Sequence, residues 1–264
     1  MKPEEQNSKP NAGSAKDRIH AITTQLVQER SVAVNALAQQ FHTSRETIRR
    51  DLNELEQQGI AIRTHGGAVL ADHVGGQFYF RSRIEVNSPQ KMKIGKFAAR
   101  MVNDGDTIFL DASTTCLYLA KQLVDKHVTV ITNSVQILFE LINFEHITLI
   151  STGGVIRPKE MDFHGAGAEA NISNFYAQKV FFSTTGFDID YGATSSFEVI
   201  ARIQRIMIQN AANVVFLCDQ SKFGKICYNR VADSEELNYI VTDGKLPDGW
   251  EKRLPKRVKV LRCE

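Results

Sequence analysis

The chain has 264 residues, which is long enough for two modest domains or one large one. With 42% hydrophobic and 23% charged residues, its composition is that of a globular fold. The formal net charge of only +2 excludes a uniformly basic protein, so any case for nucleic-acid binding depends on where the charges lie.

The sequence also argues against a membrane-spanning or secreted protein. It has no run of about 18 apolar residues, and residues 1–15 form a flexible polar segment without the apolar core of a secretory signal. The four cysteines have no CxxC spacing, so we expect neither a zinc site nor a disulfide framework. We expect free thiols in a reducing cytoplasm, and no metal or other cofactor.

Residues 16–70 are expected to form three helices followed by a hairpin. The first helix begins near Asp17, and the second follows a short extended piece and is capped by Asn35. The apolar positions that recur at helical spacing are Ile19, Ile22, Leu26 and Val27 in the first helix and Leu37, Ala38 and Phe41 in the second.

The third helix lies in the stretch TSRETIRRDLNELEQQG, residues 43–59. Thr43 and Glu46 have the spacing of a capping box, which places the helix start near Ser44, and Gly59 ends the helix. Successive residues of a helix are rotated by about 100°, so the inward face consists of Ile48, Leu52 and Leu55. The outward face carries Glu46, Arg50 and Asn53. One flank between these faces carries Arg45 and Arg49, and the other carries Thr47 and Asp51. The arginines therefore crowd the first two turns, where the helix dipole adds partial positive charge.

Two short alternating stretches follow in IAIRTHGGAVL and predict a β-hairpin with Arg63 and His65 near its tip. Three helices, the last one basic, and a hairpin make a winged helix-turn-helix, whose third helix enters the major groove of DNA. The alternative is that the arginines form an ordinary solvated face.

The stretch VNALAQQFHTSRETIRRDLNELEQQGIAIRTHGGAVL resembles the amino-terminal signature of the DeoR family of bacterial transcriptional regulators. The matching positions are Ser44, Thr47, Ile48, Arg49, Arg50, Asp51, Leu52, Gly59, Arg63, Gly66 and Gly67. The resemblance implies a DNA-binding domain over residues 16–70. The residues expected to face DNA are Ser44, Arg45, Glu46, Thr47, Arg49, Arg50, Asn53, Arg63 and His65.

Residues 71–90 are expected to be a linker with an aromatic patch at Phe78, Tyr79 and Phe80. Residues 91–264 then alternate apolar strands with helices, which predicts a largely parallel sheet covered on both faces. The expected strands are TIFLDA, VTVIT, ITLIS, KVFFSTTG, NVVFLCDQSKFG, YIVTD and VKVLR, and the expected helices are KIGKFAARMV, CLYLAKQLV, VQILFELI and one that starts at Glu198.

Ligands of such sheets bind beyond the carboxyl ends of the strands. The residues expected there are Asp111, Ser113, Thr114, Thr115, Asn133, Gly153, Gly154, Arg157, Gly186, Asp188, Asp219 and Lys222. Ser113 to Thr115 open a helix and could cradle a phosphate, with Lys222 or Arg157 as the counter-charge. Asp111 and Asp188 could accept hydrogen bonds from sugar hydroxyls. Each residue also has a local alternative as a helix cap, a turn or a partner of loop amides.

The resemblance continues through this half in LDASTT, ITNS, STGGVIR, FHG, TTGFD, Glu198 and DQSKF, which are similar to motifs of the DeoR sensor domain. It implies a fold like those of ribose-5-phosphate isomerase and CoA-transferase. It also implies a phosphorylated-sugar effector that acts on operator affinity, with Glu198 in the site. The chain looks most similar to fucose-operon regulators, although its loop after Asp188 is shorter than in most relatives.

We therefore expect a cytoplasmic regulator, a repressor as in most of the family, that binds double-stranded operator DNA and assembles as a homo-dimer or homo-tetramer. The fucose type activates instead. One alternative is a sugar-phosphate isomerase with a DNA-binding appendage, in which Glu198, Asp188 and Lys222 transfer protons and stabilise charge. Another is a constitutive DNA-binding protein whose second domain only oligomerises.

Overall fold

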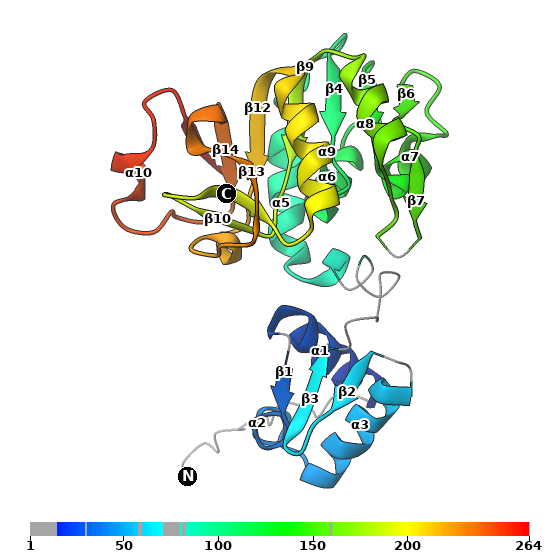
Figure 1. Cartoon of the computed structure of the whole chain (residues 1–264), viewed down its shortest axis with the longest axis vertical. Helices are drawn as coiled ribbons and strands as arrows, with labels where there is room; N and C mark the ends of the chain where they lie inside the picture. The colour runs from blue at the N-terminus through cyan, green and yellow to red at the C-terminus, as the bar shows by residue number, and fades with distance from the viewer. Residues whose placement is uncertain are drawn as a thin grey trace, which may run out of the picture. The chain divides into compact units, whose positions relative to one another are not determined.

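The protein is described by a computed structural model that covers residues 15–29, 31–57, 60–70, 80, 83–158 and 160–263. The chain divides into two compact units, Met1–Ser82 and Arg83–Glu264 (Figure 1). The second unit thus begins eight residues before position 91, at which the sequence predicts the second domain to start. Gly59, Phe78 and Tyr79, which enter the predictions above, lie outside the described residues.

The first unit packs three helices against a three-stranded sheet. Its elements are α1 Ala15–Glu29, β1 Ser31–Ala33, α2 Val34–Gln40, α3 Arg45–Gln57, β2 Ala61–Arg63 and β3 Gly67–Leu70. The strands are antiparallel in the order β1-β3-β2, so β2 and β3 form the predicted hairpin and the short extended piece before α2 completes the sheet. Leu26 of α1, Leu37 of α2 and Leu52 of α3 are fully buried in one core.

Two predicted helix caps are wrong. α2 begins at Val34 after Ala33, which β1–β3 pairing holds in extended conformation, so Asn35 lies inside the helix and caps nothing. The cap of α3 is Ser44 and not Thr43, because the Thr47 amide donates to Ser44 Oγ at 3.0 Å. The Thr43 amide instead donates to the Ala38 carbonyl, which closes the turn after α2.

Asp51 was predicted to lie on a flank of α3, between the buried and the outward faces, but it belongs to the buried face. It is buried, and Arg18 of α1 binds its carboxylate through two hydrogen bonds, Nε to Oδ2 at 2.6 Å and Nη2 to Oδ1 at 3.0 Å. Burial is possible because this fork–fork pair satisfies the charge of the carboxylate. Asp51 therefore joins α1 to α3.

The second unit is built around a seven-stranded sheet in the order β15-β14-β12-β9-β4-β5-β6, and every neighbouring pair is parallel, as the alternating pattern predicts. The strands are β4 Thr107–Leu110, β5 Thr129–Thr132, β6 Thr148–Ser151, β9 Ala177–Phe182, β12 Ala211–Leu217, β14 Tyr239–Thr242 and β15 Lys259–Arg262. Their carboxyl ends lie along one edge of the sheet.

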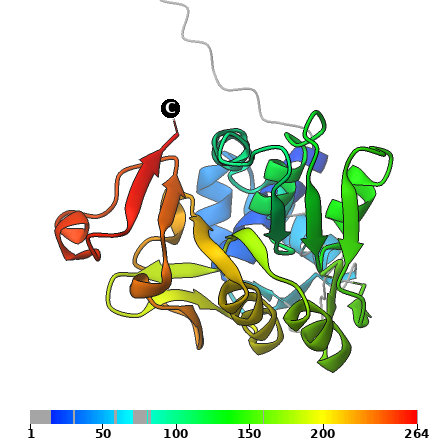
Figure 2. The ribbon, with the colours of Figure 1, turned by 90° about the horizontal axis from the view of Figure 1, so that it is seen from above.

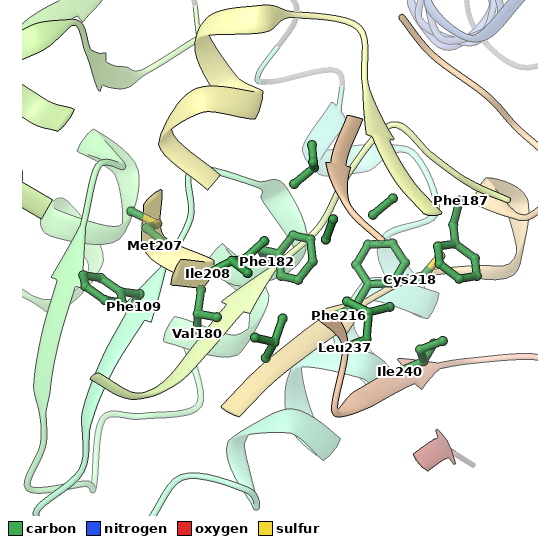
Figure 3. Packing of buried hydrophobic residues seen from close by; sticks show 14 of the residues in the cluster. Phe109, Val180, Phe182, Phe187, Met207, Ile208, Phe216, Cys218, Leu237 and Ile240 are labelled. Atoms are coloured by element: carbon green, nitrogen blue, oxygen red, sulfur yellow. The ribbon is translucent and has the colours of Figure 1, made fainter. Parts of the chain in front are cut away.

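Helices cover both faces of this sheet (Figure 2). The longer helices of this unit are α5 Ser88–Ala99, α6 Thr114–Ala120, α7 Val135–Leu141, α8 Ala166–Ser173 and α9 Glu198–Gln209. Its connections also contain the short helix α10 Trp250–Arg253 and the 3-10 turns η1 Gln220–Lys222 and η2 Ser234–Glu236. In the core on the α9 side, Met207 and Ile208 pack with Phe109, Val180 and Phe182 of the strands (Figure 3).

Two small antiparallel sheets were not predicted. One contains β10 Gly186–Asp188, β11 Gly192–Ser195 and β13 Asn229–Ala232, and the other is the hairpin β7 Val155–Arg157 with β8 Asp162–His164. The predicted strand KVFFSTTG accordingly ends at Phe182, because the chain leaves the large sheet before Gly186. Residues 189–191, the shortened loop, form the tip of the β10–β11 hairpin.

Candidate nucleic-acid interface and ligand site

The exposed face of α3 carries the residues expected to meet DNA. Arg45, Glu46, Arg49, Arg50 and Asn53 are all exposed, whereas Ile48, Leu52 and Leu55 on the opposite side are fully buried. Arg49 and Glu46 make only a loose exposed ion pair, 3.6 Å from Nη1 to Oε2. The first two turns of α3 therefore present a cationic surface at the positive end of the helix dipole.

The remaining predicted contacts lie at the edges of this face. Ser44 is exposed and caps the helix, and Thr47 is half-buried with its hydroxyl 2.9 Å from that of Ser44. His65 is exposed in the β2–β3 turn. Arg63 is different, since its guanidinium donates to acceptors within the first unit, among them the carbonyls of Gly67 and Arg49.

In the second unit, Asp111 follows β4 and is almost completely buried. Its Oδ1 accepts the Ser113 amide at 3.0 Å, and its Oδ2 accepts the Ser183 amide at 3.2 Å and Gln204 Nε2 at 2.5 Å. Burial raises the pKa of Asp111, while the hydrogen bonds from Ser113 and Gln204 lower it in part. The two loop amides are contacts of the kind that the local alternative predicts, and Gln204 adds a link from the loops after β4 and β9 to α9.

The hydroxyl and amide residues after β4 and β5 are also engaged by their surroundings. Ser113 is half-buried, and its Oγ accepts the Cys116 amide at 3.1 Å as the cap of α6. Thr114 and Thr115 are buried in the first turn of that helix. Asn133 Nδ2 donates to the Phe163 carbonyl at 3.2 Å, but its buried Oδ1 has no hydrogen-bond partner among the described residues.

Gly153 and Gly154 follow β6 with φ values of 61° and 103°, a region that favours glycine. A Cβ at Gly154 would also lie 2.6 Å from the His164 carbonyl oxygen, so the fold itself requires this glycine. Arg157 lies in β7 and binds both carboxylate oxygens of Asp162. The positive charge of Arg157 is thus balanced by Asp162 within the same hairpin.

Gly186 and Asp188 belong to β10 and not to the edge of the large sheet. A Cβ at Gly186 would lie 2.2 Å from the Lys225 carbonyl oxygen, which makes glycine necessary there. Asp188 is half-buried and accepts the Asp190 amide at 2.9 Å. Glu198 is exposed at the start of α9.

A charged cluster lies where β12 ends beside α5. Asp219 is buried and its Oδ1 accepts hydrogen bonds from Ser221 and from Asn87 Nδ2, the latter at 3.1 Å. Lys91 of α5 is also buried and donates to the Arg83 carbonyl. Burial and the neighbouring charge of Lys222 lower the pKa of Lys91 to about 7, although Asp219 opposes the shift.

Sequence reasoning missed Lys91 and Gln204. Both lie on the buried face of their helices, since Lys91 is in register with Ile94 and Ala98, and Gln204 with Ala201 and Ile208. A polar residue at an apolar position of a helical repeat is the signal that could have identified them.

Over the described ranges, no group of three or more His, Cys, Asp or Glu side chains is arranged to hold a metal ion. Within the same ranges, every helix is too short or too polar to cross a bilayer.

Comparison with known proteins matches both units to one family. Residues 18–74 match the family model of the DeoR-like helix-turn-helix domain, and residues 86–244 match that of the DeoR C terminal sensor domain. Among solved structures, ribose 5-phosphate isomerase A of Methanocaldococcus jannaschii aligns at 19% identity and a TM-score of 0.40 over 52% of this chain and 55% of that one.

The curated relatives are transcriptional regulators. The regulator YulB of Bacillus subtilis is 38% identical over 87% of this chain and 90% of its own length, and the repressor GlcR of the same species is 34% identical over 88% and 89%. The L-fucose operon activator of Haemophilus influenzae is 35% identical over 85% and 90%. The chain is therefore similar to a fucose-operon regulator, as predicted, but its sequence identity to this regulator is not higher than its identity to YulB.

The two family matches span most of the chain and the relatives align over nearly their full length. The protein is therefore a DeoR-family transcriptional regulator.

Proposed function

We propose that this regulator represses a carbohydrate-utilisation operon, and that a phosphorylated sugar bound by the second unit controls its affinity for operator DNA. Relatives named as GlcR repressor, putative aga operon repressor and L-fucose operon activator support a role in sugar metabolism. The observation that carries the proposal is the exposed cluster of Arg45, Arg49 and Arg50 at the start of α3, opposite a buried apolar stripe.

The amino-terminal end of α3 enters the major groove, and the β2–β3 wing lies along the phosphate backbone. Exposed arginines suit both tasks, because a guanidinium can bind a phosphate or donate two hydrogen bonds to guanine. The proposed DNA contacts are Ser44, Arg45, Glu46, Thr47, Arg49, Arg50, Asn53 and His65, with Arg63 beside them.

This docking is tested by the salt dependence of binding to a labelled duplex selected by the protein from a random-sequence pool. Arg50→Ala should weaken binding and, if Arg50 binds a phosphate, lower the salt slope by roughly 1 for each phosphate that is no longer neutralised. Arg100→Ala, an exposed arginine of the second unit, is the matched control. Equal affinities for Arg50→Ala and the unmodified protein would exclude α3 as the docking face.

The effector is proposed to bind at the carboxyl edge of the large sheet. The residues proposed to form this site are Asp111, Ser113, Thr114, Thr115, Asn133, Gly153, Gly154 and Lys222. Arg157 of β7, Gly186 and Asp188 of β10, and Glu198 of α9 are proposed to border it from elements outside the large sheet. Lys222 suits the phosphate best, because it is only half-buried and lies near the buried cation Lys91, so an anion would relieve their repulsion. Asp111 and Asn133 act indirectly, because their hydrogen bonds fix the loops that follow β4 and β5.

Two or four copies are proposed to assemble through the second unit and to place paired winged helices on operator half-sites. Dimer symmetry then predicts half-site spacings of about 34–36 Å or multiples of that. Effector binding alters the geometry of the pair, with a coupling of a few kcal/mol, as is typical of allosteric proteins.

A gel-shift assay with a panel of sugar phosphates tests the effector. One of them should change the operator affinity, and Lys222→Ala should abolish this response while DNA affinity without effector stays intact. Lys225→Ala, an exposed lysine in the same loop, should respond normally. A full response in Lys222→Ala would refute the phosphate assignment.

The isomerase alternative has less support, because the relatives named above are regulators. Assaying the purified protein for isomerisation of ribose and fuculose phosphates separates the two functions. Turnover at ordinary enzyme rates would reverse the proposal.

A further inference from the structure

Arg63 is bound to acceptors of the first unit instead of extending into solvent with the arginines of α3. Its Nε donates to the Gly67 carbonyl at 3.2 Å, and its Nη1 donates to the Arg49 carbonyl at 3.2 Å and to Asn53 Oδ1. One guanidinium therefore joins the wing turn to the middle of α3.

The backbone of the same residue adds a further link. The Arg63 amide donates to Glu56 Oε1 at 3.1 Å, in the last turns of α3. Within the described part of the chain, β2, which ends at Arg63, is an edge strand that pairs only with β3. The hydrogen bonds from the Arg63 amide and guanidinium therefore hold the outer strand of the wing against the helix.

We propose that Arg63 is a positioning residue for DNA binding, which sets the orientation of the wing relative to α3 through its fork of donors and does not itself bind a phosphate. The inference rests on the proposed docking of α3 and the wing onto one duplex. Both elements can bind at once only if their relative orientation matches the groove and its backbone, and a pre-set orientation saves the entropy of ordering the wing during binding.

The geometry of the fork requires arginine. A guanidinium presents five N–H donors in a fixed plane, which lets it donate to Gly67 O, Arg49 O and Asn53 Oδ1 together, whereas a lysine ammonium is a single point charge on a flexible stem. Lysine would therefore preserve a phosphate contact but not this bridge.

The test compares Arg63→Lys and Arg63→Ala on the selected duplex described above, over a range of salt concentrations. Arg63→Lys should lose about tenfold in affinity, as expected when hydrogen bonds of a charged donor are removed, while its salt slope stays unchanged because the charge is retained. If Arg63→Lys binds like the unmodified protein while Arg63→Ala binds weakly with a smaller slope, Arg63 contacts phosphate and the proposal is wrong.

A double-mutant cycle with Asn53→Ala gives an independent readout. Because Arg63 and Asn53 share a hydrogen bond, the loss of affinity in the double variant should be at least about twofold smaller than the product of the two single losses. The effects of two independent DNA contacts would multiply instead. In the free protein, both Arg63 variants should speed hydrogen exchange of the β2 and β3 amides, which removal of a phosphate contact alone would not do.

Arg50→Ala and Arg50→Lys distinguish failure of this inference from failure of the proposed function. Arg50 is exposed on α3, so the lysine variant should retain more affinity than the alanine variant. If neither Arg50 variant affects binding, the docking of α3 is wrong. If the Arg50 variants behave as expected but Arg63→Lys binds normally, only the positioning role of Arg63 is excluded.

Discussion

Asp51 and Arg63 carry charges of the DeoR-like motif, yet both side chains are used inside the first unit. Asp51 binds Arg18 in the core, and Arg63 binds the carbonyls of Gly67 and Arg49. Helical periodicity predicts the orientation of a side chain relative to its own helix, but not which neighbouring element comes to lie beside it. At the residue scale, a charged motif therefore mixes surface charges with internal connections.

The two wing glycines should differ sharply on substitution. A Cβ at Gly67 would lie 1.8 Å from the Val32 carbonyl oxygen, whereas one at Gly66 would meet open space. Gly67→Ala should therefore destabilise the first unit, by about 2 kcal/mol or more, because β1 and β3 must separate. Gly66→Ala should fold normally. Thermal denaturation of the two variants checks this pair, and equal stability would contradict the close approach.

Lys91 should make stability depend on pH. Its pKa in the folded protein is lowered to about 7 by burial and by Lys222, against an ordinary value of 10.5. Between these values the unfolded chain binds a proton that the folded chain does not, so this group destabilises most below pH 7 and its penalty fades as pH rises.

Lys91→Met should consequently be more stable than the unmodified protein at pH 6, on the order of 3 kcal/mol, with a much smaller difference near pH 10. Urea denaturation at several pH values measures the difference. Lys93→Met on the exposed side of the same helix is the control and should show no such trend. A gain that is independent of pH would rule out the buried charge as its cause.

At the scale of elements, most helices and strands were predicted and their ends were set by contacts distant in sequence. α2 starts where β1–β3 pairing ends, and β9 stops at Phe182 because the following residues turn toward the small β10–β11–β13 sheet. β7, β8 and β10 have three residues each, and their sequences VIR, DFH and GFD contain no apolar run like those of the four-residue strands that were predicted, so they were missed. β2 has the same length but was predicted from the Gly66-Gly67 turn that follows it.

The Arg18–Asp51 pair should dominate the attachment of α1 to α3. Asp51→Ala leaves the half-buried Arg18 charge without its partner, so the first unit should lose about 1–3 kcal/mol of stability. Gln39→Ala, at an exposed position of α2, should change stability by less than about 0.5 kcal/mol. Chemical denaturation followed by circular dichroism compares them, and similar values would show that the ion pair is dispensable.

At the scale of the whole molecule, the two units have separate hydrophobic cores. They also have separate proposed ligands, DNA for the first unit and a sugar phosphate for the second. The two units can therefore unfold in separate transitions, because cooperative unfolding is a property of each domain with its own packed core.

Calorimetry should therefore resolve two transitions, and an effector at a hundred times its dissociation constant should stabilise the second unit by about 2.7 kcal/mol. The transition of the first unit should be affected less. If no sugar phosphate shifts either transition, the second unit serves oligomerisation alone and the effector proposal fails.

The order of the elements, the parallel sheet and the exposed arginines of α3 could all be predicted from local sequence patterns, because they follow from the period of apolar residues and from turn and cap chemistry. Four other features are visible only in the folded chain: Asp51 is buried, Asp111 joins two loops to Gln204, Lys91 lies near Lys222, and Arg63 bridges the wing and α3. The contacts that these arrangements make between different elements join residues from 10 positions apart, as in Arg63 and Asn53, to 131 positions apart, as in Lys91 and Lys222. Such pairs depend on how whole elements pack, which no local pattern encodes.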